Sequence, residues 1–318
     1  MRNINLYSFH KGLSLDRFDC GNTNQIIQIL SKTYQVKHFD LVGNGSFIFN
    51  EEPITHGSIL IFEFEDTKEF KIFEFGDYPE ITTKLCKHEK FCGAGIGQYN
   101  KQYWDEILQS TNKRILIKPS IYPDTYWQFG IENYESIQEY RSQINLDNRL
   151  YWRGSIYKDP NRIEFNRRKS IEILSTIMGN DLYYGNFPIQ FDHYIKEAIN
   201  FKLALCFGVG GGYTCGDFCF RDMDFYGIGI PTIRPKFAAE TANPLIPNFH
   251  YISLDCEFDE TYRYKNPDKL AESIKLKYYQ VIKDTEFLNY ISKNAHQWYV
   301  NNLGSTNITN IILKSIEL

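Results

Sequence analysis

A single aspartate follows an apolar run early in the chain, in a position suited to acid–base chemistry. Asp77 lies in the sequence Gly-Asp-Tyr-Pro at 76–79, directly after a strand that we predict at 70–75. A carboxylate with an ordinary pKa near about 4 is ionised at neutral pH and can take a proton from a hydroxyl group. An aspartate before a proline also commonly bonds to its own backbone in a turn. Asp77 is therefore a candidate general base, with a turn residue as the alternative.

An arginine lies at the end of a second apolar run, where it could bind an anion. The segment 150–155 reads Leu-Tyr-Trp-Arg-Gly-Ser, and Arg162 follows it. The guanidinium of Arg153 can hold a phosphate through two parallel hydrogen bonds. Gly154 would allow backbone N–H groups to approach an anion, and Ser155 can donate a further bond. The alternative is a structural arginine at a solvated strand end, and the residues alone favour neither interpretation.

Glycines gather in a third segment, directly after another apolar run. The stretch 206–235 contains a glycine at 208 and three more at 210–212. The dinucleotide-binding pattern Gly-x-Gly-x-x-Gly fails here, because counting from Gly208 its last position is Tyr213. A P-loop would need a Lys-Ser or Lys-Thr pair, which does not follow. The cluster therefore predicts a glycine-rich turn that matches neither phosphate-loop pattern.

The same stretch contains an Asp-x-Asp motif, which some glycosyltransferases use to hold a metal on a nucleotide diphosphate. Asp222 and Asp224 form the motif, and Arg221 precedes it. A helical pattern covers 217–226, and side chains two positions apart on a helix do not face the same way. The cysteines also lack the paired spacing of a zinc site. We therefore expect no metal, with a metal-dependent transferase that uses both aspartates as the alternative.

Short apolar runs alternate with amphipathic stretches, and this pattern predicts an α/β fold. In the first half we expect strands at 35–42, 58–64, 70–75 and 114–118, and helices at 21–33 and 101–109. In the second half we expect strands at 150–155, 181–184, 204–209, 230–234 and 250–254, and helices at 193–199, 217–226, 267–283 and 285–301. The predicted crossover between the halves lies at 119–123 or 145–149. Ligands of open α/β sheets bind at the carboxyl ends of strands, where Asp77 and Arg153 are expected.

The composition limits the classes of function. The chain has 318 residues, which suits about two domains. Its net charge of −4 argues against a nucleic-acid binder with a broad basic surface. No apolar run approaches the roughly 18 residues of a membrane helix, and the first residues lack the apolar region of a signal peptide. We therefore expect a cytoplasmic protein with reduced thiols and no membrane span.

Four segments of the chain occur in the order seen in one enzyme family. They are Gly-Asp-Tyr-Pro at 76–79, Tyr-Trp-Arg-Gly-Ser at 151–155, the strand, glycine turn and arginine-bearing helix within 201–231, and the segment with His-Tyr-Ile at 243–255. A late helix at 294–303 also fits. With these segments the chain resembles the protein O-glucosyltransferase family, whose CAP-type domain is glycosyltransferase family 90. The resemblance extends from 70 to 304.

The resemblance implies a fold and a reaction. The implied fold is GT-B, with two Rossmann-like domains facing a central cleft. The acceptor-side domain would cover 1–145, with the C-terminal helix 296–318 packing back on it, and the nucleotide-sugar-binding domain would cover 146–295. The implied reaction moves glucose or xylose from a UDP-sugar to a hydroxyl of a glycan or protein. It would proceed with inversion and without a metal or another cofactor.

The resemblance also assigns roles to single residues. It implies that Asp77 is the general base, that Tyr78 lies on the acceptor side, and that Arg221 neutralises the leaving diphosphate. The other residues assigned to the donor site are Arg153, Gly154, Ser155, Arg162, Gly208 and Gly210. The chain departs from the family pattern where Gly76 and Phe207 replace frequent arginines, and where the segment from Gly208 to Arg221 is longer.

A catalytically inactive sugar- or nucleotide-binding module is the third interpretation. The many aromatic residues could stack on sugar rings, although most of them belong to the core. The strand-end positions of Asp77 and Arg153 favour an enzyme over this module. The richness in Asn, Ile, Lys and Tyr is typical of an AT-rich genome and favours a bacterial or viral member of the family.

Overall fold

The structure is a computed structural model of the 318-residue chain. It describes residues 1–8, 27–28, 30–40, 47–49, 52–54, 59–67, 70–74, 91–96, 115–117, 124–154, 165–186, 190–206, 220–236, 244–257, 265–304, 306–307, 310 and 313. The chain divides into two compact units, one formed by 1–124 with 302–318 and the other by 125–301. These boundaries differ from the predicted ones at 145/146 and 295/296.

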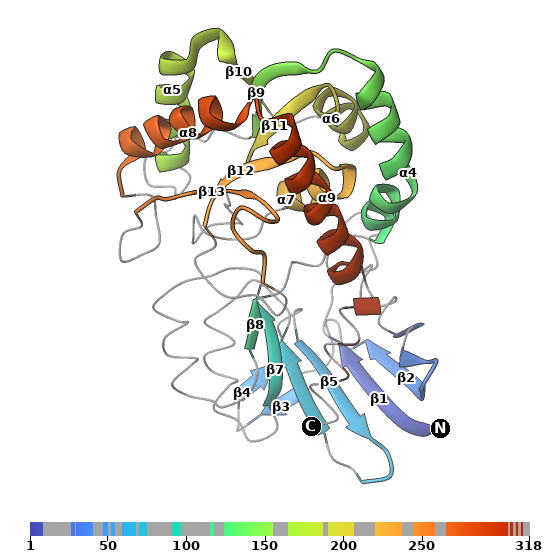
Figure 1. Ribbon diagram of the computed structural model, residues 1–318. Coiled ribbons are helices and arrows are strands. Elements are labelled where there is room, and N and C mark those ends of the chain that lie inside the picture. The colour runs from blue at the N-terminus through green and yellow to red at the C-terminus, as the bar shows by residue number, and fades with distance from the viewer. Residues whose placement is uncertain are drawn as a thin grey trace. The chain divides into compact units, whose positions relative to one another are not determined.

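The first unit contains a six-stranded sheet in the order β2-β1-β5-β6-β7-β8 (Figure 1). The strands of this unit are β1 (Arg2–Ser8), β2 (Tyr34–Asp40), β3 (Phe47–Phe49), β4 (Glu52–Ile54), β5 (Ile59–Phe64), β6 (Phe70–Glu74), β7 (Phe91–Ile96) and β8 (Ile115–Ile117). In the six-stranded sheet, β5 is antiparallel to both neighbours and the other strands run parallel to one another. The separate β3–β4 pair is antiparallel. Three of the five strand pairings in the six-stranded sheet are therefore parallel.

One buried cluster of the first unit lies on one face of this sheet. Ile4 and Leu6 alternate with polar residues along β1 and are fully buried, because successive side chains of a strand point to opposite faces. Phe62 and Phe64 of the neighbouring strand β5 pack beside them. Leu313, from the C-terminal part of the chain, packs against the same cluster. The C-terminal residues are thus part of the core of the N-terminal unit.

Five parallel strands form the sheet of the second unit, in the order β10-β9-β11-β12-β13. In chain order its elements are α4 (Asp124–Gln143), β9 (Asp147–Gly154), α5 (Phe165–Met178), η1 (Gly179–Asp181), β10 (Leu182–Asn186), α6 (Phe191–Ala198), β11 (Phe201–Leu205), α7 (Phe220–Ile228), β12 (Thr232–Pro235), β13 (Ile252–Leu254), α8 (Pro267–Val281) and α9 (Thr285–Asn302). The strand order is therefore 2-1-3-4-5, a doubly wound arrangement. Its topological switch point lies between β9 and β11, where sheets of this kind bind ligands.

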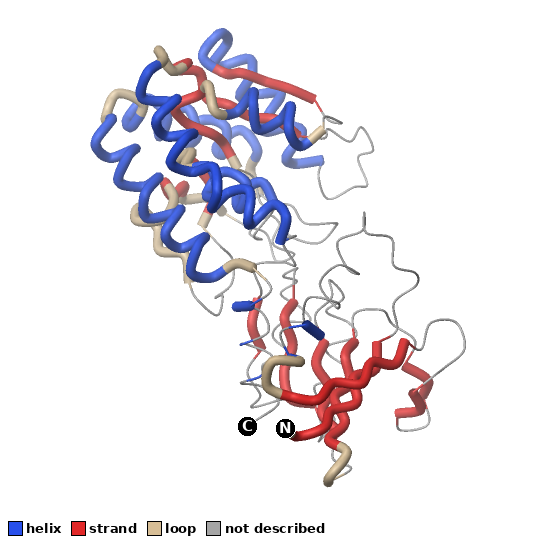
Figure 2. Tube along the Cα trace, turned by 90° about the vertical axis from the view of Figure 1, so that its right-hand side faces the viewer, coloured by secondary structure: helices blue, strands red, loops and turns tan. Residues whose placement is uncertain are grey.

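Helices cover both faces of the second sheet (Figures 1 and 2). Leu150 and Trp152 of β9 lie in one buried cluster with side chains of α5 and α8. Tyr151, between them in sequence, lies in the other cluster with side chains of α4, α6 and α7. All three are 0% exposed, and burial of each such large side chain stabilises the fold by about 1.5–3 kcal/mol. The continuous apolar run of β9 is explained by burial on both faces.

Most elements predicted for the second half are confirmed, with boundaries that differ by a few residues. The strand predicted at 204–209 is wrong in its boundaries, because β11 pairs with β9 from Phe201 onward and ends at Leu205. The polar stretch 145–149 is not simply a crossover, because β9 already begins at Asp147. The helix predicted at 101–109 lies outside the described residues, as does most of the helix predicted at 21–33.

Several elements of the structure were not predicted, among them β1, β3, β4, β7 and α4. In α4 many residues are polar, and the apolar periodicity that identifies an amphipathic helix is weak. Its buried stripe is narrow and includes Ile137 and Arg141. No helix in the described ranges has the length and apolar character needed to cross a membrane.

Candidate functional site

The carboxyl edge of the second sheet brings together two of the predicted segments. Strand β9 ends with Arg153 and Gly154 at the switch point. The neighbouring strand β11 ends at Leu205, and the glycine-rich segment that begins at Gly208 follows it directly in sequence. Helix α7 starts at Phe220, after that segment. The order strand, glycine-rich segment, helix therefore occurs at the edge where a ligand is expected.

Arg153 is held by a carboxylate from helix α6. Its Nε and Nη2 atoms donate to the two carboxylate oxygens of Glu197, at 2.8 and 2.6 Å. The hydroxyl of Tyr151 donates to the same carboxylate at 2.9 Å. Residues 151 and 153 are two positions apart on β9, so both point to the face that α6 covers. Arg153 is thus part of a fork-shaped ion pair whose side chains are 11% and 24% exposed.

The hydrogen bonds of this cluster favour its charged forms. The bonds to Glu197 raise the pKa of Arg153 above its ordinary value. Burial alone would raise the pKa of Glu197, but hydrogen bonds from Arg153, Tyr151 and Tyr183 outweigh burial and lower that pKa. Burial, and next the nearby Glu197 charge, raise the pKa of Tyr151. At neutral pH the site therefore holds an arginine cation, a glutamate anion and neutral tyrosines.

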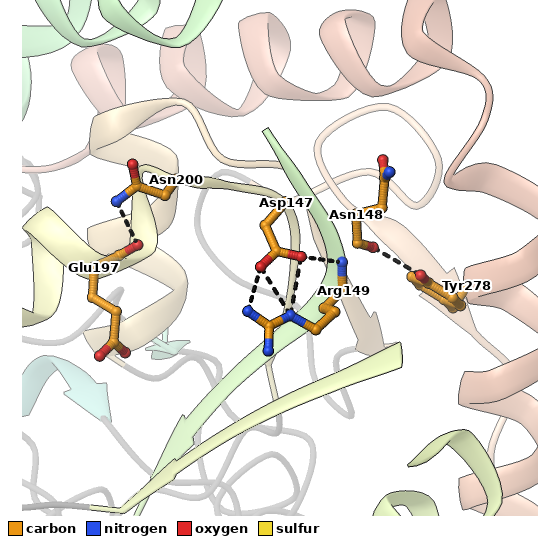
Figure 3. Close-up of polar contacts among 6 residues, drawn as sticks. All are labelled: Asp147, Asn148, Arg149, Glu197, Asn200 and Tyr278. Carbon is orange, nitrogen blue, oxygen red and sulfur yellow. Dashed lines mark hydrogen bonds and ion pairs between the residues drawn. The ribbon is translucent and has the colours of Figure 1, made fainter. Parts of the chain in front are cut away.

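The other end of β9 is fixed by polar contacts of its own (Figure 3). Asp147 accepts hydrogen bonds from the Arg149 backbone N–H and from its Nε, each at 2.8 Å. The hydroxyl of Tyr278 on α8 donates to the carbonyl oxygen of Asn148 at 2.8 Å. These contacts anchor the start of β9, and hence the strand that carries Arg153.

At two glycines beside Arg153, an added Cβ atom would force a neighbouring side chain to shift. A Cβ atom on Gly154 would lie 2.6 Å from Cζ2 of Trp152. A Cβ atom on Gly185, in the neighbouring strand β10, would lie 2.6 Å from Cζ of Arg153. Both distances are shorter than contacts made by real Cβ atoms. Gly154 thus has a packing role in the structure, and its contact with a donor stays a prediction.

Charges on helix α7 influence tyrosines of α6 and α4. Burial raises the pKa of Tyr194 on α6 well above its ordinary value, Asp224 raises it further, and Arg221 lowers it. Burial and then Asp224 also raise the pKa of Tyr126 on α4. The rings of Tyr194 and Tyr151 are 6.4 Å apart between centroids. Helices α6 and α7 both pack in the buried cluster that contains Tyr151, so Arg153 and the helix that carries Arg221 lie on the same face of the sheet.

The two aspartates of the Asp-x-Asp motif lie in different surroundings. Asp222 forms an ion pair of 2.6 Å with Arg234 of β12, and both side chains are 0% exposed. Asp224 instead acts on the tyrosines of α4 and α6. The helical position predicted for the motif is confirmed, and the arginine already neutralises one of its carboxylates. Across the residues that the structure describes, no group of three His, Cys, Asp or Glu side chains could hold a metal ion.

The remaining predicted site residues lie outside the described part of the chain: Asp77, Tyr78, Ser155, Arg162, Gly208 and Gly210. Strand β6 ends at Glu74, three residues before the predicted base. Asp77 thus follows a strand, as the sequence indicates, and its catalytic role stays a prediction.

Sequence reasoning missed three residues of the site: Glu197, Gly185 and Arg234. A signal for the first was present, because an arginine flanked by aromatic residues on a buried strand needs an acidic partner. Glu197 is the acidic residue of the helix predicted at 193–199. The other two have no local pattern, since their importance comes from residues on other elements.

Comparisons with known proteins give little further information. No family model matches the sequence, and no curated protein matches it. Among solved structures the chain is similar to the crystal structure of TarM, with 10% sequence identity and a TM-score of 0.41. The match covers 75% of this chain and 46% of TarM, so the chain spans less than half of TarM. A likeness at this level identifies neither the family nor the activity of the chain.

Proposed function

We propose that this chain is an inverting glycosyltransferase that moves glucose or xylose from a UDP-sugar to a hydroxyl of a glycan or protein. One observation carries the proposal. Arg153 is the next-to-last residue of the strand at the switch point of a doubly wound parallel sheet, and the adjacent strand continues into a glycine-rich segment and the arginine-bearing helix α7. This edge is where such sheets bind nucleotides. The order of sequence segments from 76 to 255 supports the same family of enzymes.

The proposed reaction is a single displacement. A base, which we assign to Asp77, takes the proton of the acceptor hydroxyl. The acceptor oxygen forms a bond to the anomeric carbon, and the bond from that carbon to the β-phosphate oxygen breaks. UDP leaves with the electron pair of the broken bond, and the configuration at the anomeric carbon is inverted. Protonated Asp77 then returns its proton to solvent.

The leaving diphosphate gains negative charge, and groups already aimed at it lower the barrier. Arg153 and Arg221 would supply positive charge, and the start of α7 would add the partial positive charge of a helix N-terminus. We propose that Arg221 and the helix end, with Arg153 held by Glu197, take the place of a metal ion in this task. We therefore propose a reaction without a metal or another cofactor.

We propose that one predicted domain binds the donor and the other the acceptor. The nucleotide-sugar would bind to the domain predicted at 146–295, which contains Arg153 and Arg221. Asp77 and Tyr78 would belong to the acceptor-side domain predicted at 1–145, with 296–318 packing back on it. We propose the GT-B fold and a cytoplasmic location on the same grounds.

Release of UDP from UDP-glucose and UDP-xylose tests the proposal. We expect slow release without any acceptor, faster release when a suitable hydroxyl acceptor is added, and equal rates in EDTA. Activity that is lost in EDTA and restored by manganese would instead support a metal-dependent transferase. Binding of a nucleotide-sugar without any release would identify an inactive binding module.

A further inference from the structure

Arg153 lies in an enclosure formed by three strands or helices, which we call the arginine cradle. Its members are Glu197 on α6, Tyr151 on β9, and Tyr183 and Gly185 on β10. The carboxylate of Glu197 and the hydroxyl groups of Tyr151 and Tyr183 lie around one end of the Arg153 guanidinium. Gly185 has no side chain, which leaves room for the guanidinium beside the backbone of β10. Every member is a residue whose replacement would change where the guanidinium points.

We propose that the cradle is a positioning device, in which Glu197 and Gly185 fix the orientation of Arg153 for a phosphate-bearing ligand. The inference rests on the proposed function, because it takes the nucleoside diphosphate of the donor as that ligand. Neither residue need touch the ligand itself. Both would act through Arg153.

Glu197 limits the orientation of the guanidinium through geometry. Two parallel hydrogen bonds, of 2.8 and 2.6 Å, hold the planar group in the plane of the carboxylate. One bond alone would leave the group free to rotate. Since the arginine side chain is only 11% exposed, the pair is also weakly screened by solvent. A charge held in one orientation can interact with an incoming anion without first being reorganised.

Gly185 limits the position of the same group through space. A Cβ atom there would lie 2.6 Å from Cζ of Arg153 and 2.8 Å from both Nε and Nη2. The backbone of Gly185 does not adopt the left-handed conformation that requires glycine. The clashing atoms belong to the far end of a long side chain. An added methyl group would therefore displace the guanidinium while leaving the strand in place.

The two restraints on Arg153, from Glu197 and from Gly185, allow an experiment to distinguish a positioning role from a purely structural one. A structural ion pair needs only that the two charges meet, so it tolerates a small shift of the guanidinium. A phosphate contact that depends on orientation does not tolerate that shift. Gly185→Ala is thus the informative variant, because it moves the arginine without removing any charge. Glu197→Gln is the second variant, and it keeps the shape of the side chain while removing its charge.

The test is the affinity of the full chain for UDP, measured by calorimetry, for Gly185→Ala, Glu197→Gln and Arg153→Gln. We expect each to weaken UDP binding by about tenfold or more, the loss expected when a hydrogen bond to a charged group is disturbed. We also expect Gly185→Ala to cause no further loss in a chain that already carries Arg153→Gln, because its effect passes through that arginine. The matched control is Glu172→Gln, which breaks an exposed arginine pair on α5 and should leave UDP affinity unchanged.

The outcomes distinguish the two proposals. If the wild-type chain binds UDP and Gly185→Ala and Glu197→Gln bind it equally well, the cradle has no positioning role and the proposed function stands. If Gly185→Ala weakens UDP binding equally in the wild-type chain and in the chain with Arg153→Gln, the proposed positioning role is also wrong. The effect of Gly185 on UDP affinity would then not depend on the arginine. If the folded wild-type chain binds no UDP, the proposed function fails and the role of the cradle fails with it. Circular dichroism of each variant confirms the fold, and Glu197→Gln decides the case if Gly185→Ala does not fold.

Discussion

At the scale of single residues, two arginines lie one residue before the ends of strands of the second sheet and are held in different ways. Arg234 is fully buried and bonds to Asp222 and to the carbonyl oxygen of Pro235. It ties the first turn of α7 to β12, which is a structural task. Arg153 keeps part of its surface exposed at the switch point, which suits contact with a ligand. Burial and position, more than residue type, separate these two roles.

The assignment of the base leads to the first prediction. Replacing Asp77 by Asn removes the proton acceptor and keeps the size of the side chain. Transfer should fall by at least about 100-fold, the usual contribution of a positioned general base, whereas UDP affinity should stay within about twofold of wild type. Initial rates and calorimetry on the same sample measure both. A variant that transfers sugar at the wild-type rate would show that another group is the base.

A histidine before β13 leads to the second prediction, which concerns acid stability. Burial lowers the pKa of His250 from its ordinary 6.5 to about 4, and its Nδ1 accepts a hydrogen bond from the Ile246 backbone N–H at 2.8 Å. The unfolded chain therefore takes up a proton below pH 6.5 that the folded chain resists until about pH 4. The stability linked to this residue is present above pH 6.5 and is lost as the pH falls toward 4.

His250→Asn tests this linkage, because an Asn oxygen can accept the same hydrogen bond and does not titrate. The melting temperature of wild type should fall more than that of the variant between about pH 7.5 and about pH 5. The same change at another histidine, His193→Asn on helix α6, provides the control. Equal decreases in wild type and His250→Asn would contradict the prediction.

At the scale of elements, helix α9 is fitted tightly between α4 and α7. The hydroxyl of Tyr299 on α9 lies 2.9 Å from the carbonyl oxygen of Tyr126 and 3.0 Å from that of Trp127. Cβ atoms on Gly130 of α4 and Gly227 of α7 would lie 2.5 and 2.8 Å from atoms of the same tyrosine. Both helices therefore present a glycine where the tyrosine side chain packs.

This packing leads to the third prediction, in which a Gly→Ala change in a helix lowers the stability of the protein. A Gly→Ala change within a helix ordinarily stabilises it by up to about 1 kcal/mol. Gly227→Ala should instead destabilise the protein by about 1–3 kcal/mol, because the fully buried Tyr299 has no room to move. Urea unfolding of the variant measures the change in free energy.

Tyr299→Phe is the matched comparison, since it removes the hydroxyl and keeps the ring. It should cost about 1 kcal/mol, the usual value of a lost hydrogen bond. A stabilising Gly227→Ala would mean that α9 does not pack against α7 in this way.

The elements of the second unit show what the sequence can and cannot predict. Strands buried on both faces, such as β9, produce continuous apolar runs that are easy to recognise. Helix α4 was missed because its apolar periodicity is weak. The pairing of Arg153 with Glu197 was missed because the two residues are 44 positions apart and meet only after β9 and α6 pack together. Local patterns identify elements, whereas the partners of a side chain depend on tertiary packing.

The same limit explains the Asp-x-Asp motif. Its helical position follows from local periodicity, which the structure confirms. The partner of Asp222 is Arg234, twelve residues later on a strand, and no local pattern links them. The proposed base Asp77 lies beyond the described residues, so its assignment still depends on the sequence resemblance.

At the scale of the whole molecule, each unit has a sheet and a buried core of its own. The chain enters the second unit near 125 and leaves it near 301, and its last residues contribute Leu313 to the core of the first. The candidate donor site is contained within the second unit. Nucleotide binding can therefore be tested before any acceptor is known.

Calorimetric titration of the whole chain with UDP tests the central claim most directly, with ADP as the comparison. We predict that one UDP binds per chain, more tightly than ADP, that EDTA does not change the affinity, and that Arg153→Gln weakens it by about tenfold or more. A folded wild-type chain that binds no UDP would contradict the assignment of this protein as a UDP-sugar glycosyltransferase.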